Sequence, residues 1–521
     1  MSALLFHGGR IHVGDGTTAE ALVAVDGVVR AVGRAVDLRR DHPTAERIDL
    51  QGGLMTPGWH DAHVHFTWWA IQMGQIDLRD EPTVDAALER ITEYARGLPE
   101  RAWVLGGRFD KNRWGRWPTA TELDRATAGR PAALRSRDGH ARWLNTAALR
   151  QAGIDAATPD PDGGAIERDS SGMPKGILKE NANRLADAVV PPPTSDDCFA
   201  AIERGQREAH RRGITAIEDL EQATAFHAFQ RRRDRGDLRL RVAMGIPHAS
   251  LDAAVALGLR TGLGDDWLRV GHLKIFTDGA LGSQTAALEE PYEGTTDRGL
   301  LTIEPGRLTA DVSRAAAAGI AVAIHAIGDR AVRIALDAIA PTRATEPELR
   351  QRIEHAQLLR RDDIARFGNL GVVASMQPIH ATSDRDLVDR YWGPDRATRA
   401  YPWRQLLAAG ARLAFGSDAP VEPIDPLLGI HAAVARRRPG DADRWHPEEA
   451  LTLDEAIAGY TSGAAYAMNA ERERGTLAVG MRCDAAVIER DLASVPVDEW
   501  PEVKVSATVV AGEVVYADGL G

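Results

Sequence analysis

Cysteine is almost absent from this chain, which holds only Cys198 and Cys483, far apart in the sequence. Two distant cysteines argue against a disulfide framework and against a cysteine-based zinc site. Long apolar runs are also missing, because no stretch approaches the roughly 18 apolar residues of a membrane helix. The amino terminus lacks the basic start and the apolar run of a secretory signal. We therefore expect a cytoplasmic protein with no membrane partner.

Positive charge is in deficit, with 63 lysines and arginines against 75 aspartates and glutamates, so the formal net charge is −12. A chain of this sign repels phosphate backbones, and we expect no nucleic-acid partner. The 26% of charged residues and 44% of hydrophobic residues are typical of a folded globular protein. A length of 521 residues fits a closed α/β barrel with an accessory domain, or two or three ordinary domains.

The two ends of the chain have the same sequence pattern. Residues 1–55 and 470–521 contain short strand-like runs separated by turns, such as LLFHGGRIHV at the start and VKVSATVVAGEVVYADG at the end. Either end alone would leave open sheet edges, and pairing the two ends removes part of that problem. The pattern predicts a small β-sandwich domain built from both termini.

The middle of the chain, residues 56–469, has a different pattern of apolar residues. Eight nearly continuous apolar runs alternate with helical stretches, which is typical of parallel strands buried on both faces. Eight such units predict an α/β fold, a (β/α)8 TIM barrel. A long insertion at residues 66–205 follows the first run and holds half of the 12 tryptophans. An insertion on the catalytic face would form a wall or a lid.

Two histidines stand at the end of the first predicted barrel strand, His63 and His65. Residues i and i+2 of a strand point to the same side, so both imidazoles can bind one cation. Two surface histidines at a strand end are the competing interpretation, because a short H-x-H pattern is common by itself.

Further ligand-type residues end other predicted strands: His325, His355 and Asp418. Each alone could be a satisfied core group, but a barrel brings the carboxyl ends of its strands to one mouth. Imidazole and carboxylate ligands suit zinc, iron or manganese, and zinc is the expected ion for hydrolysis without redox chemistry.

Lys274 lies inside a predicted barrel strand, where an unpaired charge is costly. One interpretation is an internal salt bridge to Asp278 or to another carboxylate. The other is a neutralised or modified lysine among the metal ligands.

Five segments together resemble the amidohydrolase superfamily: PGWHDAHVH, LKIFTDGALGS, HAIGDRAV, RIEHAQ and GSDAPVEP. They are most similar to the metal-dependent hydrolase branch that includes N-substituted formamide deformylase. The resemblance runs through nearly the whole chain, including the strands near the carboxyl terminus. It implies a site for one or two zinc or other divalent ions, with the ligands His63, His65, Lys274, His325, His355 and Asp418.

The resemblance also implies individual roles. His63 and His65 would bind the first metal, and a carboxylated Lys274 would bridge two metals. His325 and His355 would bind the second metal or complete a single site. Two positions depart from the family pattern, since His60 replaces an apolar residue and Cys483 replaces a small one; His60 lies close enough to put the strand-one ligands in doubt.

The implied reaction is hydrolysis of a C–N bond in a small amide. A bound cation lowers the pKa of its water towards about 7, and Asp418 would take the proton and pass it to the leaving nitrogen. Substrate contacts are less defined. Structural hydrogen bonds or packing compete with substrate binding at each candidate: His140, His380, Trp69 and Trp114.

Three functions compete. The first is hydrolysis of an N-acyl or N-formyl amine, and the second is opening of a cyclic amide or deamination at the same metal centre. The third is a non-catalytic binding or regulatory protein on a retained barrel, whose mark would be missing ligands. The complete ligand set favours an enzyme, and the resemblance suggests a homodimer.

Overall fold

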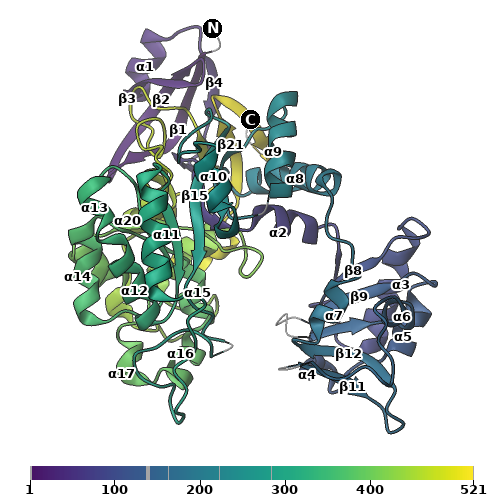
Figure 1. The fold of residues 1–521 in the computed structure, drawn as a ribbon. Helices are drawn as coiled ribbons and strands as arrows, with labels where there is room; N and C mark the ends of the chain where they lie inside the picture. Colours follow the sequence, from purple (N-terminus) through teal and green to yellow (C-terminus); the bar gives the residue numbers. More distant parts are fainter. Residues whose placement is uncertain (1–2, 137–140, 162–163, 222, 283, 520–521) are drawn as a thin grey trace. The chain divides into compact units, whose positions relative to one another are not determined.

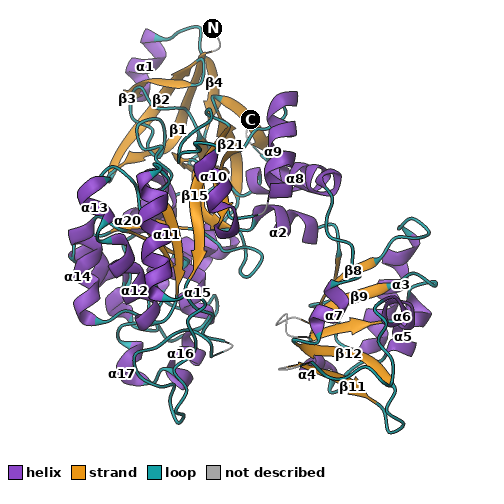
Figure 2. Ribbon diagram, in the orientation of Figure 1, coloured by secondary structure: helices purple, strands orange, loops and turns teal. Residues whose placement is uncertain are grey.

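The computed structural model describes residues 3–136, 141–161, 164–221, 223–282 and 284–519. It divides into two compact units, Met1–Trp69 with Ile202–Gly521, and Ala70–Ala201. Both units contain helices and β-strands (Figure 1, Figure 2). The domain boundaries expected from the sequence, at residues 55, 66, 205 and 470, stay predictions.

Eight parallel strands form the centre of the first unit and confirm the predicted barrel. Their residues are nearly all buried, as expected for parallel strands covered by helices on one face and packed into a bore on the other. In spatial order the strands are β6 (Trp59–Val64), β13 (Ile214–Asp219), β14 (Arg241–Pro247), β15 (Leu268–Phe276), β16 (Val322–Ala326), β17 (Arg352–His355), β18 (Val373–Met376) and β19 (Arg412–Phe415).

The last strand meets the first just beyond the end of β19. The backbone N–H of Asp418 donates to the carbonyl of His63 at 2.8 Å, and His65 N–H donates to the carbonyl of Ala419 at 2.9 Å. Gly416 permits this approach, because a Cβ there would lie 2.4 Å from the backbone nitrogen of His63. The closure therefore brings a strand-one segment and a strand-eight segment side by side.

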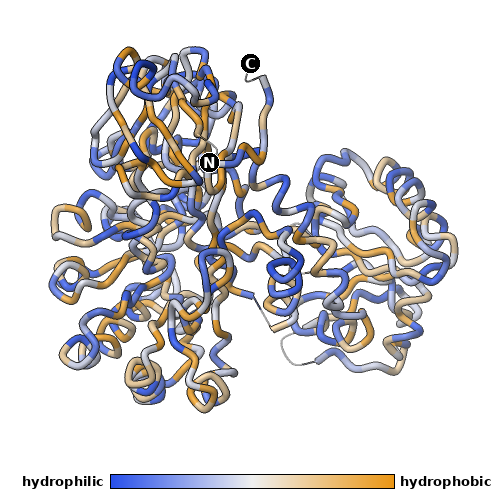
Figure 3. Tube along the Cα trace, turned by 90° about the horizontal axis from the view of Figure 1, so that it is seen from above, coloured by the Kyte–Doolittle hydropathy of each residue, from blue (hydrophilic) through white to orange (hydrophobic). Residues whose placement is uncertain are grey.

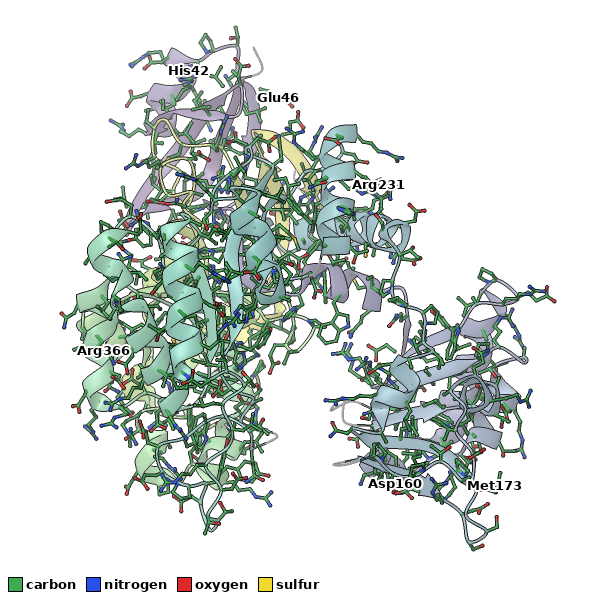
Figure 4. The ribbon with its side chains drawn as sticks, viewed as in Figure 1. His42, Glu46, Asp160, Met173, Arg231 and Arg366 are labelled. Atoms are coloured by element: carbon green, nitrogen blue, oxygen red, sulfur yellow. The ribbon has the colours of Figure 1, made fainter. Side chains whose placement is uncertain are left out.

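Helices surround the barrel strands (Figure 1). In α12 (Asp329–Ile339) the buried residues recur at helical spacing, so one apolar face packs inward. Charged side chains such as Arg366 of α14 (Arg361–Leu370) project from the outer face (Figure 4). The other α-helices that lie wholly in this unit are α1 (Ala35–Asp41), α9 (Ala223–Arg235), α10 (Leu251–Ala256), α11 (Pro305–Ala317), α13 (Thr342–Thr345), α14 (Arg361–Leu370), α15 (Pro378–Ser383), α16 (Arg385–Tyr391), α17 (Pro394–Ala397), α18 (Trp403–Ala408), α19 (Pro426–Ala435), α20 (Leu453–Ala458) and α21 (Ala464–Ala467).

The sequence predicts a β-sandwich domain built from both termini. The structure confirms a β-sheet domain shared by the two ends, and its described strands belong to one sheet. Strand β20 runs antiparallel to β5, with Ala485 opposite Pro57, so the chain ends are joined by a ladder. The strands are β1 (Ala3–Gly14), β2 (Thr17–Val25), β3 (Val28–Gly33), β4 (Glu46–Asp49), β5 (Leu54–Pro57), β20 (Ala485–Ile488), β21 (Val505–Val510) and β22 (Glu513–Ala517). Short helices complete the unit: η1 (His248–Ser250), η2 (Pro447–Glu449), η3 (Gly459–Gly463), η4 (Leu492–Ser494) and η5 (Val497–Glu502).

The second unit is built on a six-stranded sheet. Its strands are β7 (Ile76–Asp77), β8 (Val104–Phe109), β9 (Ala132–Ser136), β10 (Ala141–Leu144), β11 (Gly164–Arg168) and β12 (Pro174–Glu180). Its helices are α3 (Val84–Arg96), α4 (Lys111–Trp114), α5 (Ala120–Ala126), α6 (Thr146–Gln151) and α7 (Asn183–Asp187). Two helices, α2 (Phe66–Gln72) and α8 (Ser195–His210), contain the boundaries between the units.

Hydrophobic stretches run through both units (Figure 3). Among the residues that the structure describes, no helix combines the length and the apolar character needed to span a bilayer.

Candidate metal centre

Three predicted ligands from separate strands form a compact group at the carboxyl end of the barrel. His63 is the penultimate residue of β6, His355 ends β17, and Asp418 lies three residues beyond β19. One ligand-type atom of each lies within 4.8 Å of the other two, and all three residues are buried. The barrel thus gathers residues that lie up to 355 positions apart in the sequence.

The remaining predicted ligands border this group. The Nε2 atoms of His63 and His65 lie 3.4 and 3.6 Å from the same oxygen, Oδ1 of Asp418. The ring of His325 lies 4.6 Å from that of His355, centroid to centroid. Asp418 therefore lies among imidazoles at the ends of three barrel strands, β6, β16 and β17.

Three of these histidines have an acceptor at the ring nitrogen Nδ1. An Nδ1–H that donates to an acceptor leaves the Nε2 lone pair free for a metal, which is the usual arrangement around ligand histidines. The three pairs are His63 with Glu354 Oε2 (2.5 Å), His65 with Glu221 Oε1 (3.0 Å) and His355 with Gln377 Oε1 (2.8 Å).

In His325 the other ring nitrogen, Nε2, has the hydrogen-bond partner. Its Nε2 lies 3.0 Å from the carbonyl oxygen of Gly279, which leaves Nδ1 as the free nitrogen. Burial, with a smaller contribution from Lys274, lowers the pKa of His325 to about 3. Burial and neighbouring His325 also hold the pKa of His355 well below its usual range. Both rings are therefore neutral near pH 7, the form that binds a cation.

Asp418 is an ionised carboxylate in a buried place. Burial by itself would raise its pKa, but the neighbouring imidazoles of His63, His355 and His380 outweigh burial and hold the pKa of Asp418 well below the usual value. A carboxylate among imidazoles can both bind a cation and accept a proton.

Two of the ligand-type residues have unusual backbone angles. His355 has a φ of 72° and Asp418 a φ of 57°, in the left-handed region that non-glycine residues seldom adopt. Such angles are held by the surrounding structure and cluster at functional sites. At His355 the angle breaks the alternation of the strand, so that Glu354 and His355 both contact His63.

Lys274 is buried in β15, and its Nζ has no hydrogen-bond partner among the described residues. The sequence left open a salt bridge to Asp278, but the Asp278 oxygens accept backbone N–H groups of Ala287, Ile327 and Gly328 instead. Burial lowers the pKa of Lys274 to about 8, although Glu354 and Asp418 act to raise it.

His60 is separated from the metal group. Its charged neighbours are Arg474, Asp484 and Arg241, and neither ring nitrogen has a hydrogen-bond partner among the described residues. Burial, followed by the charge of Arg474, lowers the pKa of His60 from 6.5 to about 3.

Replacing His60 by leucine should make stability less dependent on pH. The folded-state pKa lies below the unfolded value, so unfolding takes up a proton between pH 6.5 and about 3, and stability declines as pH falls through that window. His60→Leu should reduce the slope of unfolding free energy against pH by up to about 1.4 kcal/mol per unit. Denaturant unfolding from pH 7 to 4.5 measures this slope. The exposed His227→Leu is the control, and an equal change in both variants would contradict the assignment.

The predicted substrate residues fall in different places. His380, in α15, has its Nε2 3.6 Å from Oδ2 of Asp418, and its ring lies parallel to that of His355. Trp69 packs against Phe66 with ring centroids 5.4 Å apart. Trp114 belongs to the second unit, where it stacks on Phe109 and donates its indole N–H to the carbonyl of Glu81. His140 lies outside the described residues, and all four contacts stay predictions.

The hydrogen-bond partners of the histidines, Glu354, Glu221 and Gln377, were not predicted from the sequence. The motifs RIEHAQ and SMQP contain Glu354 and Gln377 beside the expected ligands. Strict alternation along a strand would have turned Glu354 away from the side that holds His355.

The chemistry of the donor set fits a divalent cation. Imidazole nitrogens with free lone pairs and one ionised carboxylate converge at this point. Mixed nitrogen and oxygen donors of this kind suit zinc and neighbouring first-row metals.

Comparison with known proteins decides the family. Residues 46–516 match the amidohydrolase family. The chain belongs to this family. The amidohydrolase is 32% identical to the putative amidohydrolase YtcJ of Bacillus subtilis, over 98% of this chain and 99% of that protein. It is 31% identical to the N-substituted formamide deformylase of Arthrobacter pascens, over 96% of this chain and 95% of that one.

Solved structures give the same result. An uncharacterized metal-dependent hydrolase of Pyrococcus furiosus has a TM-score of 0.80 at 29% identity, covering 94% of this chain and 99% of that one. An atrazine chlorohydrolase of Arthrobacter aurescens, crystallised with zinc and atraton, shares the fold at a TM-score of 0.56 and 16% identity, covering 99% and 95%. The resemblance expected from the motifs is confirmed, and the relatives indicate a metal-dependent hydrolase.

Proposed function

We propose that this amidohydrolase cleaves the C–N bond of a small amide, an N-acyl or N-formyl amine, with water activated at a zinc centre. The observation that carries the proposal is the meeting of His63, His355 and Asp418 at the mouth of the barrel. The match to an N-substituted formamide deformylase over 96% of the chain supports the choice of bond.

Zinc would be held by the imidazoles of His63, His65, His325 and His355 and by the Asp418 carboxylate. When bound, a divalent cation acidifies a water molecule and polarises the substrate carbonyl. Asp418 accepts the proton of the attacking water, because it is ionised, and then donates that proton to the leaving nitrogen.

His380 is placed to bind the substrate carbonyl. The side-chain amide of Gln357 donates to its Nδ1 at 3.2 Å, so Nε2 is the ring nitrogen that carries a proton. That Nε2–H has no partner among the described residues and lies beside Asp418. It can donate to the oxygen on which negative charge develops during attack.

Exposed apolar side chains around the centre support a substrate with an apolar substituent. Trp68 is 40% exposed and its ring lies 6.0 Å from that of His65. Phe276 is 48% exposed and lies 5.1 Å from the ring of His325. Apolar side chains left exposed beside polar reactive groups are typical of small-molecule sites.

Lys274 is proposed to carry a carboxyl group. A neutral, buried amine can attack carbon dioxide, forming one N–C bond and releasing one proton, and the resulting carbamate is an anionic oxygen ligand. The absence of an ion pair to Nζ among the described residues supports this role over the salt bridge.

Lys274→Ala should therefore lower the metal content of the purified protein, with loss of at least one bound ion per chain where two are present. Elemental analysis against protein concentration measures the ratio. The exposed Lys504→Ala is the control and should keep the wild-type ratio. An unchanged ratio in Lys274→Ala would contradict the ligand role.

An activity screen tests the proposed reaction. Protein supplied with zinc, and the same protein after chelation, would be assayed on N-formyl amines, N-acyl amines, cyclic amides and amino-substituted heterocycles. We expect turnover of the N-formyl or N-acyl amines, lost on chelation and restored by metal. Turnover confined to cyclic amides or to deamination would replace the proposed substrate class, and a stable protein inactive on all four would favour a binding role.

A cytoplasmic location and a homodimer belong to the same proposal. Light scattering of the purified protein would test the dimer through its mass.

A further inference from the structure

A series of buried, hydrogen-bonded side chains runs through the bore of the barrel beneath the metal group. It begins at His63, whose Nδ1 lies 2.5 Å from Oε2 of Glu354, and both side chains are almost completely inaccessible to solvent. Because a carboxylate can only accept, Nδ1 carries the proton and Nε2 presents its lone pair. That Nε2 is the atom 3.4 Å from Asp418.

Glu354 is itself held in place by Arg352. The guanidinium contacts both carboxylate oxygens, with Nε 2.6 Å from Oε1 and an Nη 3.0 Å from Oε2. A bidentate pair of this kind fixes the plane of the carboxylate as well as its charge. The oxygen that faces His63 therefore has little freedom to turn away.

Arg352 reaches across the bore and is fixed by groups on other strands. It donates to Oε2 of Glu218 on β13 at 2.7 Å and to the carbonyl of Ala62 on β6 at 2.6 Å. Ser375 on β18 accepts a further bond at 3.1 Å. Three strands besides its own thus hold one guanidinium.

Glu218 lies at the other end of this series of side chains. Its Oε1 lies 2.7 Å from Nδ1 of His272, and the backbone N–H of His272 donates to the same oxygen at 3.2 Å. Each carboxylate oxygen of Glu218 and Glu354 thus has a hydrogen-bond partner, so the side chains have few other conformations open to them.

We propose that Glu354 is a positioning residue for the metal ligand His63, and that Arg352 and Glu218 hold it in place. The carboxylate fixes the tautomer and the ring orientation of His63. It also makes the Nε2 lone pair a stronger electron-pair donor to the metal. Carboxylates that accept from a ligand histidine commonly change metal affinity by about 10- to 100-fold when removed. The inference rests on the proposed function, because it presumes that His63 binds the metal.

Three variants separate positioning from simple stability. Glu354→Gln keeps the shape and removes the charge, and Glu354→Asp keeps the charge opposite Arg352 but withdraws it from His63. Asp484→Asn is the matched control, since Asp484 forms an equally buried bidentate pair with Arg241 and contacts no proposed ligand.

Zinc affinity is measured by competition with a chelator, and the geometry of the site by the visible absorption spectrum of the cobalt-substituted protein. Both Glu354 variants should bind zinc about 10- to 100-fold more weakly with an altered cobalt spectrum. Asp484→Asn should lose stability while keeping wild-type affinity and spectrum. If Glu354→Gln does not fold, Glu354→Asp and the control still decide.

The outcomes are distinct. Wild-type affinity and spectrum in the Glu354 variants would overturn the positioning role while leaving the metal centre intact. A folded wild-type protein that binds neither zinc nor cobalt would overturn the proposed function itself.

Discussion

Asp418→Asn should lower kcat/KM by at least about 100-fold on any amide that the wild-type protein hydrolyses, within the range that general acid–base groups contribute. Asparagine has nearly the same shape but cannot accept the proton of the attacking water. It also removes the negative charge that His63, His65 and His380 share at distances of 3.4 to 3.6 Å. Steady-state kinetics on the substrate found in the screen measures the loss.

Asp425→Asn provides the control for this variant. Asp425 lies seven residues further on and accepts the backbone N–H of Leu427 at the start of α19, a role that asparagine also fills. We expect near wild-type turnover from Asp425→Asn and a thermal midpoint close to wild type for Asp418→Asn. Near-normal activity of a metal-loaded Asp418→Asn protein would remove the proton-transfer role from this residue.

Arg352→Met should destabilise the protein by about 3–5 kcal/mol, the usual cost of breaking a buried ion pair by removing one partner. The methionine fills much of the volume but leaves Glu218 and Glu354, both fully buried, without their shared cation. Denaturant unfolding at pH 7 measures the change, on chelated protein so that metal binding does not contribute.

An exposed arginine gives the comparison. Arg233 pairs with Asp265 at 2.6 Å, but its side chain is 48% exposed, and Arg233→Met should cost about 0–1 kcal/mol. Equal and small losses of unfolding free energy in the two variants would mean that the buried ion pairs of Arg352 contribute little to stability.

The strand ends made the barrel and the position of the candidate site within it predictable. Apolar runs of strand length that close with histidine or aspartate can be recognised in a sequence, and a parallel barrel places all such ends at one mouth. The spacing of His63 and His65 follows from the period of a strand. Hence the five histidine and aspartate candidates, predicted from four separate segments, lie around one point in the structure.

The groups behind the ligands were not predictable in the same way. The contact of Arg352 with Glu218 depends on strands β17 and β13 facing each other across the bore, which no local pattern encodes. The contact of His355 with His63, on the same side as Glu354, depends on the left-handed backbone at His355. Long-range pairs and single unusual φ angles are properties of the closed barrel rather than of any segment.

Aromatic residues illustrate a different limit. A tryptophan in an insertion can line a pocket or pack a core, and its neighbours in sequence are alike in both cases. Trp114 stacks on Phe109 within the second unit, whereas Trp68, beside the ligand His65, is left 40% exposed. Only the contacts of the folded chain distinguish the two.

The metal content of the purified protein tests the central claim most directly. After growth with zinc and removal of loosely bound ions, the wild-type chain should carry at least one divalent ion per molecule. A double variant, His63→Asn with His355→Asn, should carry none while it remains folded. A folded, active wild-type protein without stoichiometric metal, or a double variant that retains it, would contradict a catalytic cation at the mouth of this barrel.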